Sequence, residues 1–324
     1  MQVMRRFSTL VCAALMLALP GAACAQAYPA RPVHVIISFP PGSSTDIVGR
    51  VVVQKLSELW GQPVLPENRG GAGGTIGAGI VAKSAPDGYT LLIDSSAHAV
   101  SPAIYAKLQF DTLKDFTDVA PLAGQPNVLV ALPGSPTKSV ADLVAEAKAK
   151  PGKINFASAG IGSGTHLNLE KFKLVTGVDV THIPYKGTQE VMTDLLGGRV
   201  EYYFAPISAA LSSIRDGKLR AIAVSGARRS SSLPEVPTVA ESGVPGFEFT
   251  LWFGVWGPAG MPADVVDKIS KDVNRALADP GVRDRLTKLG NDTMNMTPVE
   301  FGQFVRREVE DYARIITAAG IKPQ

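Results

Sequence analysis

The segment at residues 154–166 reads INFASAGIGSGTH and contains groups that could hold an anion. An apolar run is followed by glycines at every second position from Gly160 to Gly164, then by a hydroxyl and a histidine. Glycines let a ligand approach the backbone, and a helix that begins after them offers free N–H groups and partial positive charge. Such a loop suits any small anion, including a carboxylate. The alternative is a plain strand-to-helix turn in which Ser163 or Thr165 caps the helix.

The glycine spacing does not fit the nucleotide-binding motifs. The dinucleotide fingerprint needs glycines at the first, third and sixth loop positions, and here the third glycine comes one residue early. No G-x-x-x-x-G-K-S/T motif occurs in the chain. The hydrolase motif G-x-S-x-G is absent, because Ile161 and Thr165 stand two residues from Ser163. A Ser163 and His166 pair is possible, but no orienting acid is apparent, so a secreted hydrolase is the least favoured class.

The first 27 residues have the pattern of a cleavable secretory signal. Arg5 and Arg6 form a basic start, and residues 9–19 form an apolar run that is too short to span a bilayer as a helix. Two small-residue cleavage sites follow, which end at Ala25 and Ala27. We expect cleavage after Ala27 and a soluble mature protein in the periplasm.

Composition excludes several function classes. Cys12 and Cys24 are the only cysteines and both lie in the signal, so the mature protein has no disulfide or thiol chemistry. The chain has 32 basic and 29 acidic residues, and loss of Arg5 and Arg6 leaves 30 basic residues, which does not suggest a nucleic-acid partner. The four histidines are scattered without metal-binding spacing. An exported protein meets little ATP or NAD, so no cofactor is expected.

Strand and helix patterns alternate along the mature chain. Buried strands are expected in "VHVIIS", "NVLVAL", "INFASA" and "RVEYYF", with amphipathic helices of about 10 to 15 residues between strands. This pattern is typical of parallel sheets with helices on both faces. The strands are too many for one compact sheet, so we expect an α/β fold of two lobes around a ligand cleft. Lobe 1 would comprise residues 28–126 and 229–324, and lobe 2 residues 127–228.

A second loop repeats the shape of the first. The run VIISFPPGSSTDIVGR at residues 35–50 is again strand, glycine loop and helix, with hydroxyls at Ser43, Ser44 and Thr45. Ligands of open α/β sheets bind beyond the carboxyl ends of the strands, so two such loops could hold one ligand from opposite lobes. Asp46 either caps the following helix or faces a ligand ammonium or hydroxyl group.

Other polar residues follow predicted strands. Residues 87–94 (DGYTLLID) are expected to form a turn and then a strand, and Ser95 and His98 come after this strand and could line the cleft. Tyr185 and Lys186 lie in PYKGTQE, just before a predicted helix, and could border it.

Several long runs resemble the Bug family, the TctC-like extracytoplasmic solute receptors of tripartite tricarboxylate transporters. These runs are RPVHVIISFPPGSSTDIVGR, ENRGGAGGTIGAGIVAKSAPDGYTLL, PYKGTQEVMTDLLGGRVEYYF, GKLRAIAVSGARRSSSLPEVPTVAESGVPGFE and WFGVWGPAGMP. The resemblance covers nearly the whole mature chain. It implies a two-lobed periplasmic binding protein (a Venus flytrap) that holds a carboxylate through loop amides, hydroxyls and waters, without an arginine clamp. It also implies delivery to the inner-membrane permease subunits of the transporter.

The chain departs from the family pattern in places. Gly70 stands where the family commonly has proline, and Met261 replaces a usual threonine. Ala205, followed by Pro206, stands where the family often has an acidic residue that could meet a ligand amino group. Its absence favours plain organic or aromatic carboxylates over amino acids.

The resulting hypothesis is a monomeric carboxylate receptor that works by lobe closure, not an enzyme. A ligand-sensing receptor for a membrane signalling partner is the alternative. The candidate ligand-binding residues are Gly42, Ser43, Ser44, Thr45, Asp46, Ser95, His98, Ser158, Gly162, Ser163, Gly164, Thr165, His166, Tyr185, Ala205 and Pro206.

Overall fold

The computed structural model describes residues 28–323, so the expected signal at residues 1–27 lies outside the described part. One continuous ten-stranded sheet runs through it, with the main strand order β2-β1-β3-β9-β4-β7-β5-β6. The strands are β1 (Val33–Ile37), β2 (Val64–Asn68), β3 (Thr90–Ser95), β4 (Phe116–Ala131), β5 (Asn155–Ser158), β6 (Thr181–Pro184), β7 (Tyr202–Pro206), β8 (Arg220–Val224), β9 (Thr250–Pro258) and β10 (Asp292–Thr293).

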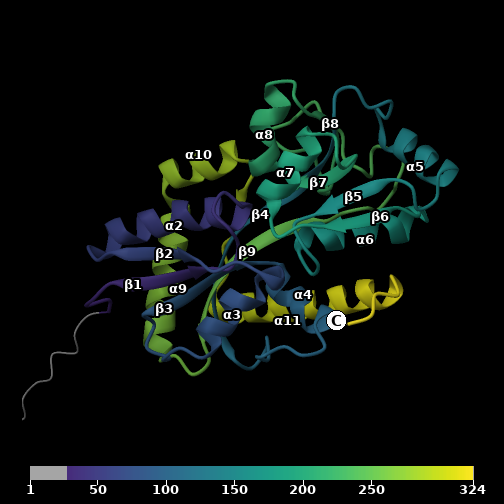
Figure 1. The fold of residues 1–324 in the computed structure, drawn as a ribbon. Coiled ribbons are helices and arrows are strands. Elements are labelled where there is room, and N and C mark those ends of the chain that lie inside the picture. The colour runs from purple at the N-terminus through teal and green to yellow at the C-terminus, as the bar shows by residue number, and fades with distance from the viewer. Residues whose placement is uncertain (1–27, 324) are drawn as a thin grey trace, which may run out of the picture.

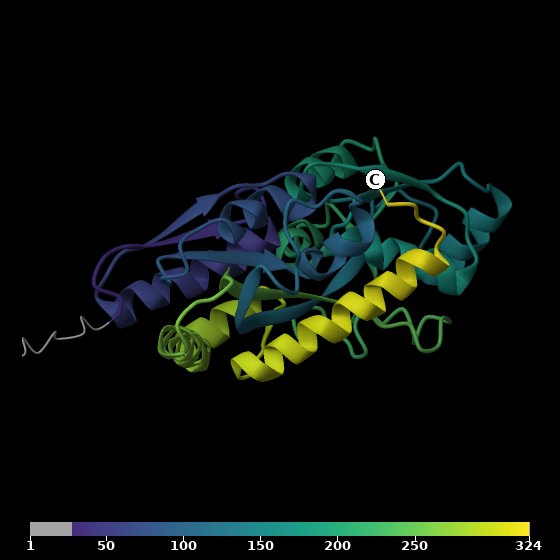
Figure 2. The same cartoon turned by 90° about the horizontal axis from the view of Figure 1, so that it is seen from below.

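Helices cover both faces of this sheet (Figures 1 and 2). They are α2 (Ser44–Trp60), α3 (Thr75–Ala82), α4 (Ala97–Ile104), α5 (Val140–Ala149), α6 (Gly164–Thr176), α7 (Thr188–Leu196), α8 (Ile207–Arg215), α9 (Ala263–Ala278), α10 (Pro280–Lys288) and α11 (Pro298–Ala318), with a short 3-10 helix at Ala72–Gly74. Figure 2 shows α11 running obliquely along the molecule, and it packs against α4, β4 and α6. Within residues 28–323, no helix is long and apolar enough to cross a membrane.

The long strand β4 connects the two halves of the sheet. Up to Pro126 it pairs with β9, and from Asn127 onward it pairs with β7 and β8. We call the half that contains β1–β3 lobe 1 and the half that contains β5–β8 lobe 2 (Figure 1). The chain therefore passes from lobe 1 to lobe 2 inside a paired strand, which gives the hinge a defined register.

The segment at residues 229–249, which the sequence assigned to lobe 1, also packs against lobe 2. Leu233 and Val236 pack in the lobe 2 core beside α7 and α8. Phe247 stacks on Phe204 of β7, with ring centroids 6.2 Å apart, and meets Phe172 of α6 edge-on. Much of the apolar surface of residues 229–249 is therefore buried against lobe 2, and β9 follows as the second hinge strand.

The expected two-lobed α/β fold is confirmed, and its parallel units are joined by antiparallel strands. Only β1 with β2 and β3, and β5 with β6 and β7, are parallel. The hinge strands β4 and β9 run antiparallel to each other and to their outer neighbours β7 and β3. Each lobe is built from parallel β-α-β units, whereas the two connecting strands must run in opposite directions because one leaves lobe 1 and the other returns.

Alternate residues of β9 face opposite sides of the sheet. Leu251, Phe253 and Val255 belong to the buried cluster beneath α2 and α9, whereas Trp252 and Trp256 belong to the cluster beneath α4 and α11. This period-two alternation lets one strand serve two separate cores.

A buried serine ties the two hinge segments together. Ser225 Oγ accepts from Asn127 N at 2.8 Å and donates to Phe249 O at 2.6 Å. Backbone bonds from Ser225 N to Asn127 O and from Phe249 N to Ser225 O complete the junction. All the groups are buried, so each depends on its protein partner.

Ser225→Ala should lower the free energy of unfolding by roughly 1–3 kcal/mol, because it leaves a buried N–H and a buried carbonyl without a partner. Urea denaturation would measure the loss. Ser242→Ala is the matched control, since the Ser242 hydroxyl donates to Thr238 O where water can replace it. Equal losses of unfolding free energy in the two variants would show that the Ser225 hydroxyl contributes no more to stability than the Ser242 hydroxyl does.

Candidate functional site

The two glycine loops have nearly the same backbone geometry. Gly42 and Gly162 both adopt left-handed conformations, with φ of 77° and 79°. Ser43 and Ser163 follow as helix N-caps at φ/ψ of −69°/161° and −70°/155°. Each serine hydroxyl accepts the backbone N–H three residues later, at 3.3 Å in both loops. The sequence repetition is therefore a structural one, with one copy in each lobe.

The side chain of the third residue of each helix holds the loop in place by accepting a hydrogen bond from the loop glycine. Asp46 Oδ2 accepts from Gly42 N at 2.9 Å, and His166 Nδ1 accepts from Gly162 N at 3.2 Å. The other carboxylate oxygen of Asp46 accepts from Arg50 Nε at 2.7 Å. Neither Asp46 nor His166 lines the cavity between the loops, so the idea that they face a ligand has no support from the geometry.

The cavity itself lies where the two loops meet. Its volume is about 20 Å³, which is room for roughly one water molecule. The residues that line it are Phe39, Ser43, Ser44, Thr45, Ser95 and Leu251 from lobe 1 and its hinge strand, and Ala159, Ser163, Gly164, Thr165, Thr188 and Pro206 from lobe 2. Eight of these, namely Ser43, Ser44, Thr45, Ser95, Ser163, Gly164, Thr165 and Pro206, were candidates from the sequence.

Helix N-termini converge on this cavity. The first residues of α2, α6 and α7 line it, and Pro206 is the N-cap of α8. Unpaired N–H groups and the positive ends of the helix dipoles therefore point towards one small space. No lining residue carries a charge. The arrangement suits an anion that is held by neutral donors.

Two of the hydroxyls already have structural partners. Ser163 Oγ lies 3.0 Å from Thr165 Oγ1, and Thr165 Oγ1 accepts from Ala159 N at 2.9 Å. In contrast, Ser44 stands at the first helical position, beyond the N-cap, and its hydroxyl makes no hydrogen bond to residues 28–323. The same holds for the Thr45 hydroxyl, so Ser44 and Thr45 offer the hydroxyls most available to a ligand.

The lobes touch at the mouth of the cleft. Gln189 Nε2 of lobe 2 donates to Gly42 O of lobe 1 at 2.7 Å, and Tyr105 OH of lobe 1 donates to Ile161 O of lobe 2 at 3.0 Å. A Cβ atom on Gly164 would collide with Leu251 Cδ1, so any larger residue here would have to displace that side chain where α6 meets lobe 1. These contacts define a closed conformation.

A larger pocket of about 610 Å³ lies at this mouth. Tyr185 and Lys186 line it together with Gly70, so both residues of the PYKGTQE run border the cleft as expected. The Tyr185 hydroxyl donates to Asp194 Oδ2 at 2.8 Å. Ala159 lines both this pocket and the inner cavity, which places the two next to each other.

His98 lies in the core instead of the cleft. Its side chain is fully buried, with ring centroids 4.6 Å from those of both Phe116 and Trp256. Burial lowers the pKa of His98 to about 3. The sequence placed His98 correctly after β3 but predicted no helix there, and its position on α4 points the ring into the aromatic cluster.

Ser158 and Ala205 also lie outside the cavity lining. Ser158 Oγ lies 2.6 Å from His182 Nε2 behind the lobe 2 loop, and the His182 ring stacks on His166 at 4.2 Å. Ala205 packs in the lobe 2 core, and its neighbour Pro206 faces the cavity because the side chains of β7 alternate. Gly42 and Gly162 shape the loops without lining the space.

Sequence reasoning missed Phe39, Ala159, Thr188 and Leu251 in the lining and the lobe-bridging Gln189. Thr188 could have been identified from the sequence, because it follows the strand β6 and Gly187 just as Ser43 follows β1 and Gly42. The other residues depend on how the lobes meet. Among residues 28–323, no group of three or more metal-ligating side chains is placed to hold a metal ion.

A family model described as "Tripartite tricarboxylate transporter family receptor" matches residues 48–321. The chain belongs to this receptor family. The resemblance noted in the sequence is thereby confirmed. Protein BugT of Bordetella pertussis is 39% identical over 300 residues, which cover 92% of each chain.

Solved structures of related binding proteins share the fold. "R. palustris Rpa4515 with adipate" has a TM-score of 0.88 at 34% identity and covers 92% of this chain and 100% of its own. MatC from Rhodopseudomonas palustris with bound malate has a TM-score of 0.84 at 34% identity and covers 89% and 100%. The structure of the periplasmic binding protein BugD has a TM-score of 0.87 at 34% identity, and the match covers 92% of this chain and 100% of the BugD chain. The receptor family thus accounts for the two-lobed architecture.

Asp94 is a buried acid at the end of β3 that the sequence did not single out. Burial raises its pKa to about 7, although hydrogen bonds from Ser38 and the Ser95 backbone oppose the rise. Ser95 N donates to Asp94 Oδ1 at 2.7 Å. Ser95 lines the cavity, so this carboxyl lies directly behind a wall of the site.

The Asp94 carboxyl should make stability fall as pH rises. Its pKa in the folded protein exceeds its unfolded value, so the folded state binds more protons between about pH 4 and pH 7. Relative to Asp94→Asn, the wild-type protein should lose on the order of a few kcal/mol across that window and then level off. Urea unfolding at several pH values would measure this, with exposed Asp267→Asn as control. If the difference in unfolding free energy between wild type and Asp94→Asn did not change with pH, the raised pKa of Asp94 would be contradicted.

Proposed function

We propose that this protein is a periplasmic receptor that captures a small organic carboxylate between its lobes and presents it to the membrane subunits of a tripartite transporter. The observation that carries the proposal is the convergence of helix N-termini and hydroxyls from both lobes on one uncharged cavity. Its relatives include structures with adipate and with malate, and both of these ligands are carboxylates.

The lining favours a plain carboxylate over an amino acid. An amino acid ligand brings an ammonium group, and burying that group without an acidic or carbonyl partner is costly. No acidic side chain lines the cavity, and Asp46 is already satisfied by Gly42 N, Arg50 and Asn68. One carboxylate of the ligand lies between the loops at Ser44 and Thr165, which separate slightly to admit it because the cavity here holds about one water, and the remainder of the ligand extends towards the mouth pocket.

Capture works by lobe closure about the hinge strands. The inner cavity has no room for a whole ligand to pass while Gln189 and Tyr105 bridge the lobes. The ligand therefore enters an open form, and contacts to both loops favour the closed form by their differential affinity.

The geometry gives little support to a hydrolase. Ser163 Oγ receives the backbone N–H of His166, while the imidazole Nδ1 is occupied by Gly162 N. Ser158 and His182 do form a close pair, but Ser158 is fully buried and lies outside the cavity lining. Neither serine is thus presented to a substrate by a free base.

A carboxylate ligand should raise the melting temperature of the protein lacking residues 1–27. At about 100 times Kd the linkage term is about 2.7 kcal/mol, which corresponds to roughly several degrees. A thermal-shift screen of mono- and dicarboxylates, amino acids and sugars would identify the class. A response to sugars alone would overturn the carboxylate assignment, and turnover of ester substrates would indicate an enzyme instead.

The two loop serines should respond differently to removal of their hydroxyls. Ser44→Ala should weaken carboxylate binding by roughly ten- to a hundredfold, because a hydrogen bond to a charged group is lost, and should leave the melting of the unliganded protein unchanged. Ser163→Ala should weaken binding and also lower stability by about 1 kcal/mol, because Ser163 caps α6. Calorimetric titration and melting of both variants would test this. Unchanged affinity in both would mean that the loops are only turns.

A further inference from the structure

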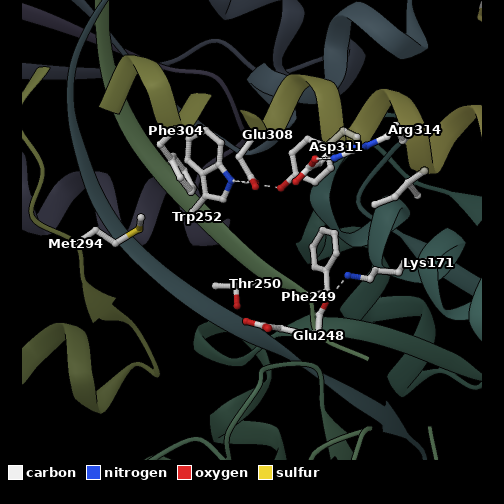
Figure 3. Close-up of a pocket in the computed structure, with 12 residues that line it drawn as sticks. Lys171, Glu248, Phe249, Thr250, Trp252, Met294, Phe304, Glu308, Asp311 and Arg314 are labelled. Carbon is white, nitrogen blue, oxygen red and sulfur yellow. Dashed lines mark hydrogen bonds and ion pairs between the residues drawn. The ribbon is translucent and has the colours of Figure 1, made fainter. Parts of the chain in front are cut away.

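A second cavity lies behind the hinge, with a volume of about 550 Å³ (Figure 3). This volume is within the usual range of small-molecule sites. Along β9, Leu251 lines the ligand cavity, whereas Thr250 and Trp252 line this second space. Because neighbouring strand residues point to opposite faces, the two cavities lie on either side of one hinge strand. We call the second space the rear cavity.

Both lobes contribute to the rear cavity. Helix α11 of lobe 1 supplies Phe304, Glu308 and Tyr312, and lobe 2 supplies Lys171 and Glu248. In Figure 3 the α11 side chains lie on one side of an open space, and Lys171 and Glu248 lie on the other. The shape of the rear cavity therefore depends on the angle between the lobes.

Aromatic rings form much of the wall, and the acid that lies among them, Glu308, has no cationic partner. Phe249, Trp252, Phe304 and Tyr312 line the space. Glu308 Oε2 accepts from Trp252 Nε1 at 2.6 Å, but no basic nitrogen of residues 28–323 comes within ion-pair distance of this carboxylate.

The nearby cations are engaged elsewhere. Arg314 pairs with Asp311 on the same helix, and Lys171 donates to the backbone oxygen of Glu248. Burial and the Glu308 carboxylate both raise the pKa of Tyr312, so this hydroxyl stays protonated beside Glu308. An unpaired carboxylate among ring faces is the chemistry that attracts an organic cation with an apolar stem.

We propose that the rear cavity binds a small alkylammonium or alkylguanidinium ion, and that its occupancy favours closure of the ligand cleft. The cationic head lies against Glu308, and the apolar stem lies against Phe304 and Phe249. An occupant between α11 and the segment around Glu248 would hold these two walls at the separation they have in this closed conformation. The two sites are therefore coupled through the hinge.

Binding is tested by calorimetric titration of the protein lacking residues 1–27 with n-butylguanidinium chloride, with n-butanol as the neutral probe. The cation should bind and the alcohol should not. Glu308→Gln should weaken cation binding about tenfold or more, because the charge is lost while the amide oxygen can still accept from Trp252. Glu310→Gln, an exposed position on the same helix, should change it less than about twofold. Absence of cation binding, or equal effects of the two variants, would overturn the site.

A circular dichroism melt of each variant shows whether the variant is still folded. Phe304→Leu provides a second test, since it removes a ring face but keeps an apolar side chain. It should weaken cation binding about threefold or more. A native melt with unchanged cation binding in Phe304→Leu would contradict the aromatic contact.

Coupling is tested by spin labels on Lys83→Cys in lobe 1 and Lys218→Cys in lobe 2. Residues 28–324 contain no other cysteine, so labelling is specific. The cation alone should increase the population at the closed-state distance, and it should tighten binding of the best carboxylate about fivefold or more. An unchanged distance distribution would overturn the coupling. Failure of every carboxylate to bind would overturn the proposed function only, because the distance measurement needs no carboxylate.

Discussion

The antiparallel pairing of β4 with β9 is the constraint on which the rest of the structure depends. It joins the lobes through backbone hydrogen bonds between two strands instead of through a flexible linker. Both strands are buried, so the lobes can rotate but cannot slide without exposing unpaired N–H and carbonyl groups. The loops at Ser43 and Ser163 therefore meet in one register whenever the cleft closes. The site needs that precision because its donors are short hydroxyls and backbone amides.

An anion site without a cationic side chain has a physical advantage for a receptor that must release its ligand. An arginine clamp gains strong charge-assisted bonds, but a buried ion pair carries a large desolvation cost and is slow to separate. Helix N-termini give a fixed partial charge, and they remain satisfied by water when the cleft opens. Their positions are set by the helices α2, α6 and α7, so binding orders few long side chains.

The local parts of this arrangement could be predicted from sequence, and the long-range parts could not. The two loops were recognised because glycine and hydroxyl residues follow apolar strands at short range. Nothing in the periodicity of residues 298–318 indicates that the helix they form, α11, crosses behind the hinge. The first half of β4 was missed because Pro121 and Gly124 interrupt its pattern. His98 was misplaced because the position of a side chain on a short helix after β3 depends on how that helix packs.

The pseudo-symmetry of the loops also explains why their third helical residues differ. Asp46 and His166 both hold a loop glycine, yet one is an acid and the other a base. The Asp46 charge is compensated by Arg50 Nε, with Asn68 as a further donor, so it adds little negative potential to the cavity. Burial, together with the nearby His182 and Lys173, lowers the pKa of His166 to about 3, so its ring is neutral and its Nδ1 can accept. Each lobe thus stabilises its loop from behind without placing an uncompensated negative charge near the anion, which leaves the helix N-termini as the dominant field in the cleft.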